Sequence, residues 1–297
     1  SSSMLVYPRE PVTIEEKINL NKLLVQSGLK ISEINEIRKF FSSVKAGGLL
    51  NFIRCKKIVQ LIVSDVPGNM IKTIGSSPLV KSKINKKRVL KLIENNFGDK
   101  KSFKSLIDKL HDIPDAAPQN ITKVVSIIMH DNYYSQQITR NAFLKKGFDT
   151  YFPGEILNCT VEEGVNFFQS FINKKKEIFS LNPVAYIGGG EVTTKVTGAR
   201  KGGRNLEFAM RMAKEINGLN GLYFIAVATD GLDGNSGVAG AIVDFNSFNR
   251  AENAGFGYND YLKAGNSLEY LKVAGKIIKN VKKGGNQNDL YILIKTG

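Results

Sequence analysis

The sequence predicts an α/β fold made of a Rossmann-like parallel-sheet domain and a smaller α/β domain with a mixed sheet. Its 297 residues, of which 42% are hydrophobic, are enough to bury one large core or two ordinary ones. Short apolar runs rich in β-branched residues alternate with segments of helical period. Near residue 180 strand-sized runs and glycines become denser. We therefore expect domains at 1–180 and 181–297, with the boundary near 177–182.

The first domain opens with two predicted helices. Thr13 and Glu16 have capping-box spacing ahead of apolar positions that run to Val25, and Gly28 is well placed to end that helix. A second helix is expected from about Ser32, with Ile34, Ile37 and Phe41 on its apolar face. Together the two helices account for the first forty-five residues.

Strands and helices then alternate, which favours a parallel sheet. Lys57–Val63 is a nearly continuous apolar run, typical of a strand buried on both faces, and a turn follows at once. The other expected elements of this domain are a helix at 87–96, a strand at 123–129, and helices at 134–146 and 161–173.

The second domain is expected to hold more strands than helices. The predicted strands cover 183–187, 192–197, 222–228, 239–243 and 290–294. The predicted helices run from the turn at 202–205 to about Ile216, and from Ser267 to Ile278. We expect this smaller α/β domain to have a mixed sheet.

Composition excludes several classes of protein. No apolar stretch reaches the roughly 18 to 20 residues that span a bilayer, so we expect no membrane partner and a cytoplasmic location. The two cysteines are far apart and belong to no C-x-x-C or Cys/His cluster, and two histidines argue against a His-based zinc site, which needs three or four converging ligands. The 42 Lys and Arg exceed the 27 Asp and Glu, which gives a net charge of +15. The basic residues are scattered without a recognition motif, so we expect a small anionic substrate and no nucleic acid.

Polar loops follow the predicted strands, where open α/β sheets bind ligands. The turn Gly202-Gly-Arg-Asn205 would direct backbone N–H groups, a helix N-terminus and the Arg204 guanidinium at an anion, although such turns are often only structural. Asp230 and Asp233 could hold Mg²⁺, directly or through water, or could merely stabilise a turn. Asp65 presents another carboxylate at a strand end, and Asn288 and Asp289 belong to a polar cluster that could equally be a capped turn.

Taken together and in order, these stretches resemble the type 2 glycerate kinases, whose C-terminal module is called MOFRL. The resemblance rests on Ser27–Lys39, on Leu61–Gly68, on Gly189–Glu191, on Gly202–Glu207, and on the stretches Thr229–Gly234 and Asn286–Leu290. No single stretch is diagnostic, but their order and spacing are.

The resemblance implies ATP-dependent phosphorylation of D-glycerate to 2-phosphoglycerate with Mg²⁺, in a cleft between the two domains. Phosphoryl transfer requires mainly positioning and charge stabilisation. The resemblance places Arg204 on the transferring phosphoryl group and makes Asp65 and Asp230 the candidates for binding metal or orienting the hydroxyl, without deciding which does which. Asp233 stays a candidate metal ligand because of its spacing from Asp230. The resemblance implies substrate or nucleotide contacts for Ser3, Arg38, Lys45, Glu191, Gly202, Gly203, Asn205, Glu207, Asn288 and Asp289.

The resemblance also implies that Ser1–Val6 corresponds to a glycine-rich phosphate loop, and that the first strands and a lysine precede it in a longer chain. Three alternatives remain open: a kinase-like protein that binds nucleotide without turnover, a hydroxypyruvate reductase, the label that some family members carry, and a nucleic-acid binder suggested by charge alone. No dinucleotide-binding fingerprint supports the reductase. A homodimer is a further expectation.

Overall fold

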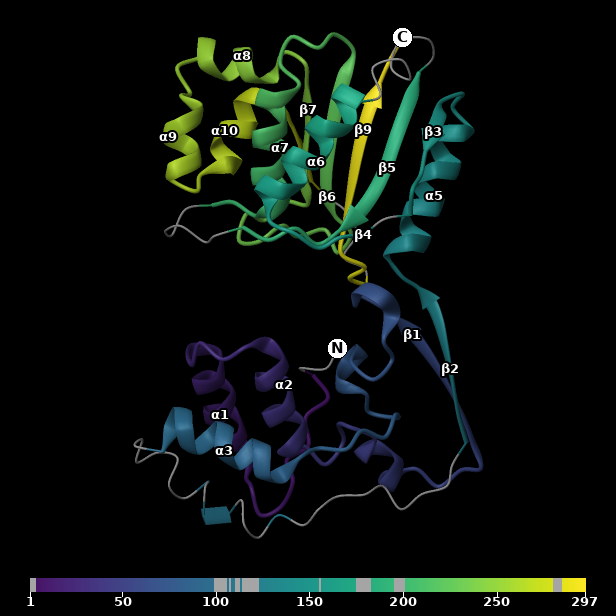
Figure 1. Ribbon diagram of the computed structural model, residues 1–297, viewed down its shortest axis with the longest axis vertical. Coiled ribbons are helices and arrows are strands. Elements are labelled where there is room, and N and C mark those ends of the chain that lie inside the picture. Colours follow the sequence, from purple (N-terminus) through teal and green to yellow (C-terminus); the bar gives the residue numbers. More distant parts are fainter. Residues whose placement is uncertain are drawn as a thin grey trace. The chain divides into compact units, whose positions relative to one another are not determined.

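The computed structural model describes residues 4–98, 106, 108–109, 113, 123–154, 156–174, 183–194, 201–279 and 285–297. The chain forms two compact units (Figure 1). The first unit comprises 1–62 and 68–127, and the second comprises 63–67 and 128–297. This division differs from the predicted boundary at 177–182, which lies outside the described residues.

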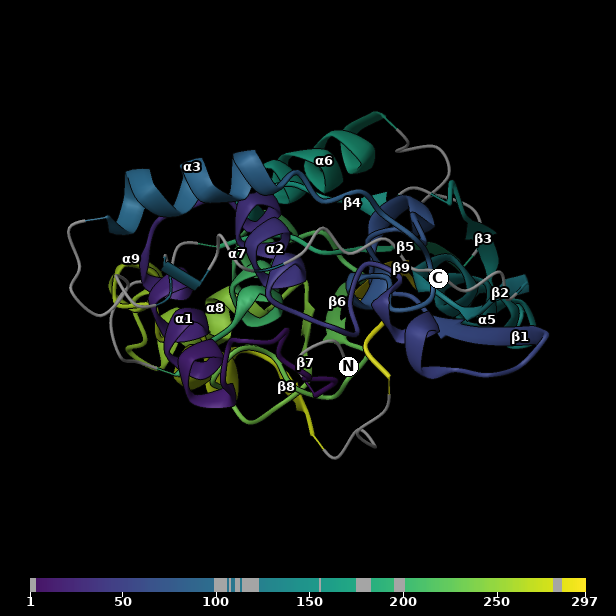
Figure 2. The same ribbon diagram turned by 90° about the horizontal axis from the view of Figure 1, so that it is seen from below.

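The first unit contains the three helices expected from the sequence, α1 (Ile14–Gln26), α2 (Ile31–Phe40) and α3 (Lys86–Phe97), which lie together in both ribbon views (Figures 1 and 2). The capping box of Thr13 and Glu16 is formed. Gly28 follows with a φ of 74°, a left-handed conformation that favours glycine. The apolar faces of the three helices bury a shared core, which includes Leu24, Ile37, Phe41, Val89 and Ile93.

Strands β1 (Lys57–Val63) and β2 (Lys123–His130) form a two-stranded sheet. Each strand begins in the first unit and ends in the second, because the division falls after Ile62 and after Ile127. They run in parallel: Lys123 N–H donates to Lys56 O at one end, and Ser64 N–H donates to His130 O at the other. The expectation that β1 is buried on both faces is wrong, because Val59 and Leu61 are 54% and 65% exposed. Within the described part of the chain β1 pairs only with β2, and no element covers these side chains.

The second unit is built on a mixed sheet of seven strands. Strand β9 (Asp289–Lys295) lies between β5 (Val184–Gly190) and β6 (Leu222–Ala228) and is antiparallel to both. Beyond β6 the sheet continues antiparallel through β7 (Gly240–Asp244) to β8 (Lys276–Ile278). On the other side, β3 (Asp149–Tyr151) and β4 (Ile156–Leu157) pair in parallel with β5. This pairing assigns residues before the predicted boundary to the second unit.

Helices cover both faces of this sheet (Figure 1). One face packs against α6 (Val161–Lys174), α7 (Arg204–Glu215) and α10 (Ser267–Ala274), with α8 (Ser247–Asn253) and α9 (Tyr258–Lys263) outside them. Phe168, Phe208, Phe224 and Tyr291 form an aromatic cluster in that core. The other face carries a smaller apolar cluster beneath α5 (Asn132–Leu144).

Two predicted elements of the second unit differ from those observed. Residues 192–194 make only an isolated bridge, Thr160 to Thr193, because Thr193 N–H donates to Cys159 O and Thr193 O accepts from Val161 N–H. Residues 195–197 lie outside the described residues. The helix expected to reach Ile278 ends at Ala274. Gly275 is extended, and β-branched Ile277 and Ile278 pair with β7 as strand β8.

The sequence did not reveal α8, α9, β3 or β4, which are short. None of the helices in the described parts of the chain has the length and apolarity needed to cross a membrane.

We expect Phe168→Ala to lower the free energy of unfolding of the second unit by about 3–5 kcal/mol, because it leaves a cavity in the aromatic cluster. Urea unfolding followed by fluorescence or circular dichroism measures the change. Ile138→Ala, on the half-exposed side of α5, is the matched control and should change stability by less than about 1 kcal/mol. Equal losses in the two variants would contradict this assignment of the core.

Candidate functional site

The functional groups of the second unit gather at one edge of its sheet. In register, Asp289 of β9 faces Gly190 of β5 on one side and Ala228 of β6 on the other. Because β9 is antiparallel to both neighbours, its first residue meets the carboxyl ends of both strands. The loops that follow β5 and β6 and the segment that precedes β9 therefore converge, as the sequence analysis expected of polar loops at a sheet edge.

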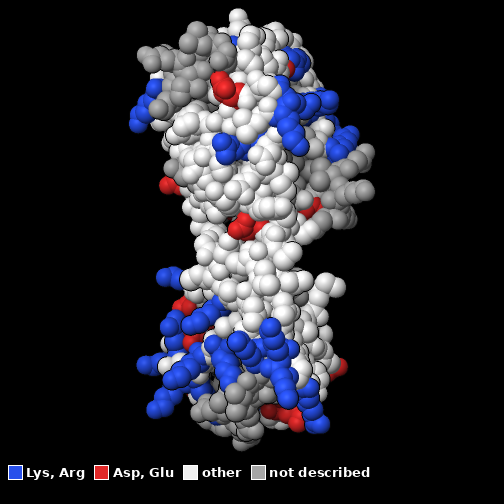
Figure 3. Space-filling model, turned by 90° about the vertical axis from the view of Figure 1, so that its right-hand side faces the viewer, with Lys and Arg blue, Asp and Glu red and all other residues white. Residues whose placement is uncertain are grey.

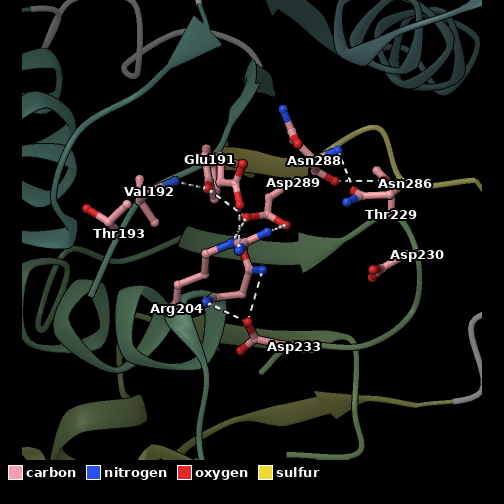
Figure 4. A network of polar contacts seen from close by, with 12 residues as sticks. Glu191, Val192, Thr193, Arg204, Thr229, Asp230, Asp233, Asn286, Asn288 and Asp289 are labelled. Carbon is pink, nitrogen blue, oxygen red and sulfur yellow. Dashed lines mark hydrogen bonds and ion pairs between the residues drawn. The ribbon is translucent and has the colours of Figure 1, made fainter. Parts of the chain in front are cut away.

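Arg204, the first residue of α7, is held between two carboxylates (Figure 4). Its Nε donates to Asp289 Oδ2 at 2.6 Å and its Nη2 to Asp289 Oδ1 at 3.3 Å. Its Nη1 lies 2.8 Å from Glu191 Oε1. A guanidinium has five N–H donors, so two remain for a ligand after these three contacts with described residues. The side chain is 30% exposed, which leaves it accessible from solvent.

Asp289 is the buried centre of this network. Its side chain has no exposed surface, and its Oδ2 also accepts a hydrogen bond from the Tyr291 hydroxyl at 3.1 Å. Burial raises the pKa of the Asp289 carboxyl, and the hydrogen bonds and charge of Arg204 oppose that rise. Burial also disfavours the charge on Arg204, but Asp289 and Glu191 outweigh it and raise the pKa of the guanidinium. The ion pair thus fixes the direction of Arg204.

The turn before α7 is held by Asp233. Its Oδ1 accepts from Asn205 N–H at 3.1 Å and its Oδ2 from Leu206 N–H at 2.9 Å, so this carboxylate caps the helix. Any side chain at Gly203 would collide with the same carboxylate. Burial raises the Asp233 pKa to about 6, against the two backbone hydrogen bonds. Both oxygens are engaged, and metal ligation by Asp233 stays a prediction.

The segment before β9 is held from two sides. Thr229, at the end of β6, contributes its N–H and Oγ1–H as donors to Asn288 O, at 3.1 and 2.7 Å. Asn288 has a φ of 64°, and its Nδ2 donates to Asp65 O at 2.9 Å. The predicted residues Asp65, Asn288 and Asp289 are therefore brought together, with the exposed Asp65 side chain following strand β1.

Asn132 is a site residue that the sequence analysis missed. It is buried at the start of α5, and its Nδ2 donates to Gln287 O at 2.7 Å and to Asp289 O at 2.9 Å. Gln136, one turn later, donates to Asn132 Oδ1 at 2.8 Å. A side chain at Gly189 would collide with that oxygen, so β5 must carry a glycine there. The sequence did contain a signal, because Asn132 is a polar residue that closely follows a predicted strand. We had expected the helix there to begin only at Tyr134 and therefore did not consider Asn132.

The remaining predicted residues lie elsewhere. Glu207 bonds Thr194 and pairs with Arg211 at 2.8 Å, so it belongs to the contact between α6 and α7 and not to the Arg204 network. Asp230 lies apart from the dashed network in Figure 4 and accepts from Leu232 N–H at 3.0 Å in a short turn. Arg38 and Lys45 are part of the first unit, and Ser3 lies outside the described residues.

The donor set suits a magnesium ion carried by a phosphate ligand. Among the described residues no three His, Cys, Asp or Glu side chains converge on a metal position. Mg²⁺ does not need such a cage, since it is usually held by one or two carboxylates, substrate phosphates and water. Asp230 has one carboxylate oxygen outside its turn. Arg204, Asp289 and Glu191 together carry one net negative charge, so a bound phosphate needs an additional cation here.

Comparisons with known proteins agree with this geometry. A model of a domain of unknown function, DUF4147, matches residues 1–110, and the MOFRL family model matches residues 184–289. The D-glycerate 2-kinase of Thermotoga maritima is 31% identical over 294 residues, which cover 98% of this chain and 69% of that protein. The chain belongs to the glycerate 2-kinase family. The glycerate 2-kinase of Pyrococcus horikoshii is also 31% identical, with 99% and 68% covered.

Solved structures of the family share the fold. The crystal structure of glycerate kinase from Thermotoga maritima superposes with a TM-score of 0.85 at 30% sequence identity and covers 99% of this chain and 70% of that one. A relative from Agrobacterium vitis, 28% identical over 298 residues (99% of this chain, 67% of that protein), is named a putative hydroxypyruvate reductase. The glycerate kinase resemblance and the α/β fold class expected from the sequence are confirmed.

We expect Asp233→Ala to destabilise the second unit by about 1–2 kcal/mol, because it leaves two buried N–H groups of α7 without an acceptor. Urea unfolding with and without millimolar Mg²⁺ measures the loss. A cap gives the same loss in both conditions. Asp260→Ala, at an exposed position of α9, is the control and should cost less than about 0.5 kcal/mol in both conditions. A loss seen only with Mg²⁺ would instead identify Asp233 as a metal ligand.

Proposed function

We propose that this protein is an ATP-dependent kinase that phosphorylates D-glycerate to 2-phosphoglycerate with Mg²⁺. The single observation that carries the proposal is the Arg204 guanidinium, fixed by Asp289 and Glu191 at the N-terminus of α7, with two N–H donors remaining. The names of the relatives from Thermotoga maritima and Pyrococcus horikoshii supply the substrate. In this proposal the oxygen of the glycerate C2 hydroxyl forms a bond to the γ-phosphorus of ATP. The bond between that phosphorus and the oxygen it shares with the β-phosphate breaks, which releases ADP.

Each proposed role follows from the chemistry of the side chain. Arg204, at the start of α7, binds the phosphoryl oxygens with its two remaining N–H donors as charge shifts during transfer. Asp65, which is exposed, orients the substrate hydroxyl and accepts its proton. Asp230 supplies a carboxylate oxygen to the Mg²⁺ that the nucleotide carries, and that ion offsets the net negative charge around Asp289.

Other residues hold these groups in place or bind an anionic group of a substrate. Asn205 and Asn288 fix the loops on either side of Arg204, and Glu191 and Asp289 fix its direction. Arg38 and Lys45, in the first unit, bind an anionic group of a substrate. Gly202 and Gly203 lack side chains, which makes room for Ser267 and for the Asp233 carboxylate that caps α7.

Arg204→Met should lower kcat/KM for D-glycerate phosphorylation by roughly 10³-fold, because the phosphoryl group loses a bidentate cation. A coupled assay of ADP release measures the rate, and phosphorus NMR identifies the product as the 2- or 3-phosphate. Arg140→Met, at an exposed cation–π contact with Phe152, is the control and should leave the rate unchanged. Full activity of Arg204→Met would refute the assigned role.

The same preparation decides between the alternatives. Binding of ATP by calorimetry without any ADP release, at saturating glycerate and Mg²⁺, would indicate a kinase-like protein that has lost catalysis. Oxidation of NADH by hydroxypyruvate would indicate a reductase. Either result would overturn the proposed kinase activity.

Asp230→Asn should raise the Mg²⁺ concentration needed for half-maximal activity by about tenfold, because an amide oxygen is a weaker ligand for a hard cation. Titration of Mg²⁺ at a fixed, saturating ATP concentration measures the shift. Asp260→Asn, on the outlying helix α9, serves as the control. An unchanged Mg²⁺ requirement would remove Asp230 from the site.

A further inference from the structure

The two carboxylates that hold Arg204 differ in how firmly they are placed. Asp289 belongs to β9 and its side chain is buried, whereas Glu191 follows β5 and its side chain is 41% exposed. Figure 3 shows charged side chains exposed on one face of the protein, and ion pairs between such side chains hold a geometry only weakly. The place of Glu191 therefore depends on the backbone that carries it.

The backbone after β5 is tied to its surroundings by three hydrogen bonds. Glu191 N–H donates to Leu157 O at 2.7 Å, and Thr193 N–H donates to Cys159 O at 2.8 Å. Between them, Val192 N–H donates to the Tyr291 hydroxyl at 3.1 Å. In the described part of the chain, this last bond is the one that ties residues 191–194 to β9.

Tyr291 also contacts the other carboxylate. Residues two apart on a strand share a face, so Tyr291 lies on the same face of β9 as Asp289. Its hydroxyl donates to Asp289 Oδ2 at 3.1 Å. A hydroxyl has a single proton, so the oxygen that accepts from Val192 N–H directs its own proton to Asp289. One hydroxyl group thus connects the two parts of the chain that hold Arg204.

The surroundings of the Tyr291 hydroxyl keep it a donor. The residue has no exposed surface, and burial together with the charge of Asp289 raises the pKa of the hydroxyl. A tyrosine ordinarily titrates at about pH 10, so this group stays protonated at neutral pH. Arg204 Nε donates to the same oxygen, Asp289 Oδ2, at 2.6 Å. Tyr291 and Arg204 therefore meet on one carboxylate oxygen.

Packing explains the ring of Tyr291 but not its hydroxyl. The ring lies 5.0 Å from that of Phe208, and Gly188 and Ala226 flank it in the sheet register. A phenylalanine would fill the same space without needing polar partners. The buried Tyr270 of α10 offers a contrast, because its hydroxyl makes no hydrogen bond to a described residue. The hydroxyl of Tyr291 makes both of its hydrogen bonds to the segments that hold Arg204.

We infer that Tyr291 is a positioning residue of the kinase reaction: its hydroxyl joins Asp289 to the segment that carries Glu191, and so holds Arg204 in the orientation that stabilises the transferring phosphoryl group. Tyr291 acts through Arg204. The inference deepens the proposed function and rests on the role that it gives to Arg204.

Tyr291→Phe removes one oxygen atom and keeps the ring. The kcat for ADP release with D-glycerate should fall about tenfold, while KM for ATP and for D-glycerate should change less than about twofold, because Arg204 acts as charge shifts in the transition state. Tyr270→Phe removes a buried hydroxyl without a described partner, so it is the matched control and should keep the wild-type kcat. A wild-type kcat in Tyr291→Phe would overturn the inference.

A double-mutant cycle separates action through Arg204 from a general effect on the fold. In the Arg204→Met background, adding Tyr291→Phe should change the residual kcat by less than about twofold, because the group through which the hydroxyl acts is already absent. A tenfold loss in both backgrounds would show that the hydroxyl acts independently of Arg204, and would also overturn the inference.

Nuclear magnetic resonance tests the positioning without the reaction. The Tyr291 hydroxyl proton and the Arg204 Nε–H proton share Asp289 Oδ2 as acceptor, so isotope-labelled wild-type protein should show a nuclear Overhauser effect between them. Arg204→Met identifies the arginine signal by its loss. That signal should exchange faster with water in Tyr291→Phe and stay unchanged in Tyr270→Phe. Absence of the effect in the wild type would refute the inference, even if Tyr291→Phe does not fold.

The failures of the inference and of the proposed function give different patterns. Loss of activity in Arg204→Met, together with wild-type kcat and an unchanged Arg204 signal in Tyr291→Phe, would refute the inference alone. No ADP release by the wild type would refute the proposed function. The magnetic resonance measurements would then still decide whether Tyr291 positions Arg204.

Discussion

The site in the second unit depends on one buried carboxylate. Asp289 lies at the first residue of β9, and the sheet register places it between Gly190 and Ala228. Burial alone would disfavour its charge. The guanidinium of Arg204 and the hydroxyl of Tyr291 compensate, and in doing so Arg204 is fixed relative to the sheet. Without a charged partner at this position, Glu191, whose side chain is partly exposed, would be the one ion-pair partner left to Arg204 among the described residues.

The surrounding loops serve to place that carboxylate and its partner. Asp233 secures the first turn of α7, Thr229 and Asn132 hold the backbone that leads into β9, and Asn288 bonds the loop after β1. Most of these contacts use backbone groups, so they constrain the chain more strongly than exchangeable side-chain pairs would. Few residues of the site are therefore placed to bind a ligand, and many residues position them.

Much of the fold followed from the sequence because its signals are local. The capping box at Thr13, the apolar run of β6 and the glycine turn before α7 each act over a few residues. The pairing of β9 with β5 and β6 joins residues that lie from 61 positions apart (Ala228 and Asp289) to 111 positions apart (Val184 and Lys295), and no local pattern indicates it. Contacts between residues far apart in the sequence also explain the other misses. Asn132 was missed, and Asp233 was expected only as a metal ligand or a turn residue, because their partners are distant in the sequence. The exposure of Val59 and Leu61 was not foreseen for the same reason.

The end of β5 shows how an absence of side chains can determine a site. At Gly189 an added Cβ would lie 2.8 Å from the Asp289 carbonyl oxygen, and at Gly190 it would collide with the backbone of Leu157. The strand can therefore accept no side chain where it borders the carboxylate. Random mutagenesis should find these positions intolerant although neither glycine has a functional side chain, so a map of mutational sensitivity would mark the site through residues that have no side-chain chemistry of their own.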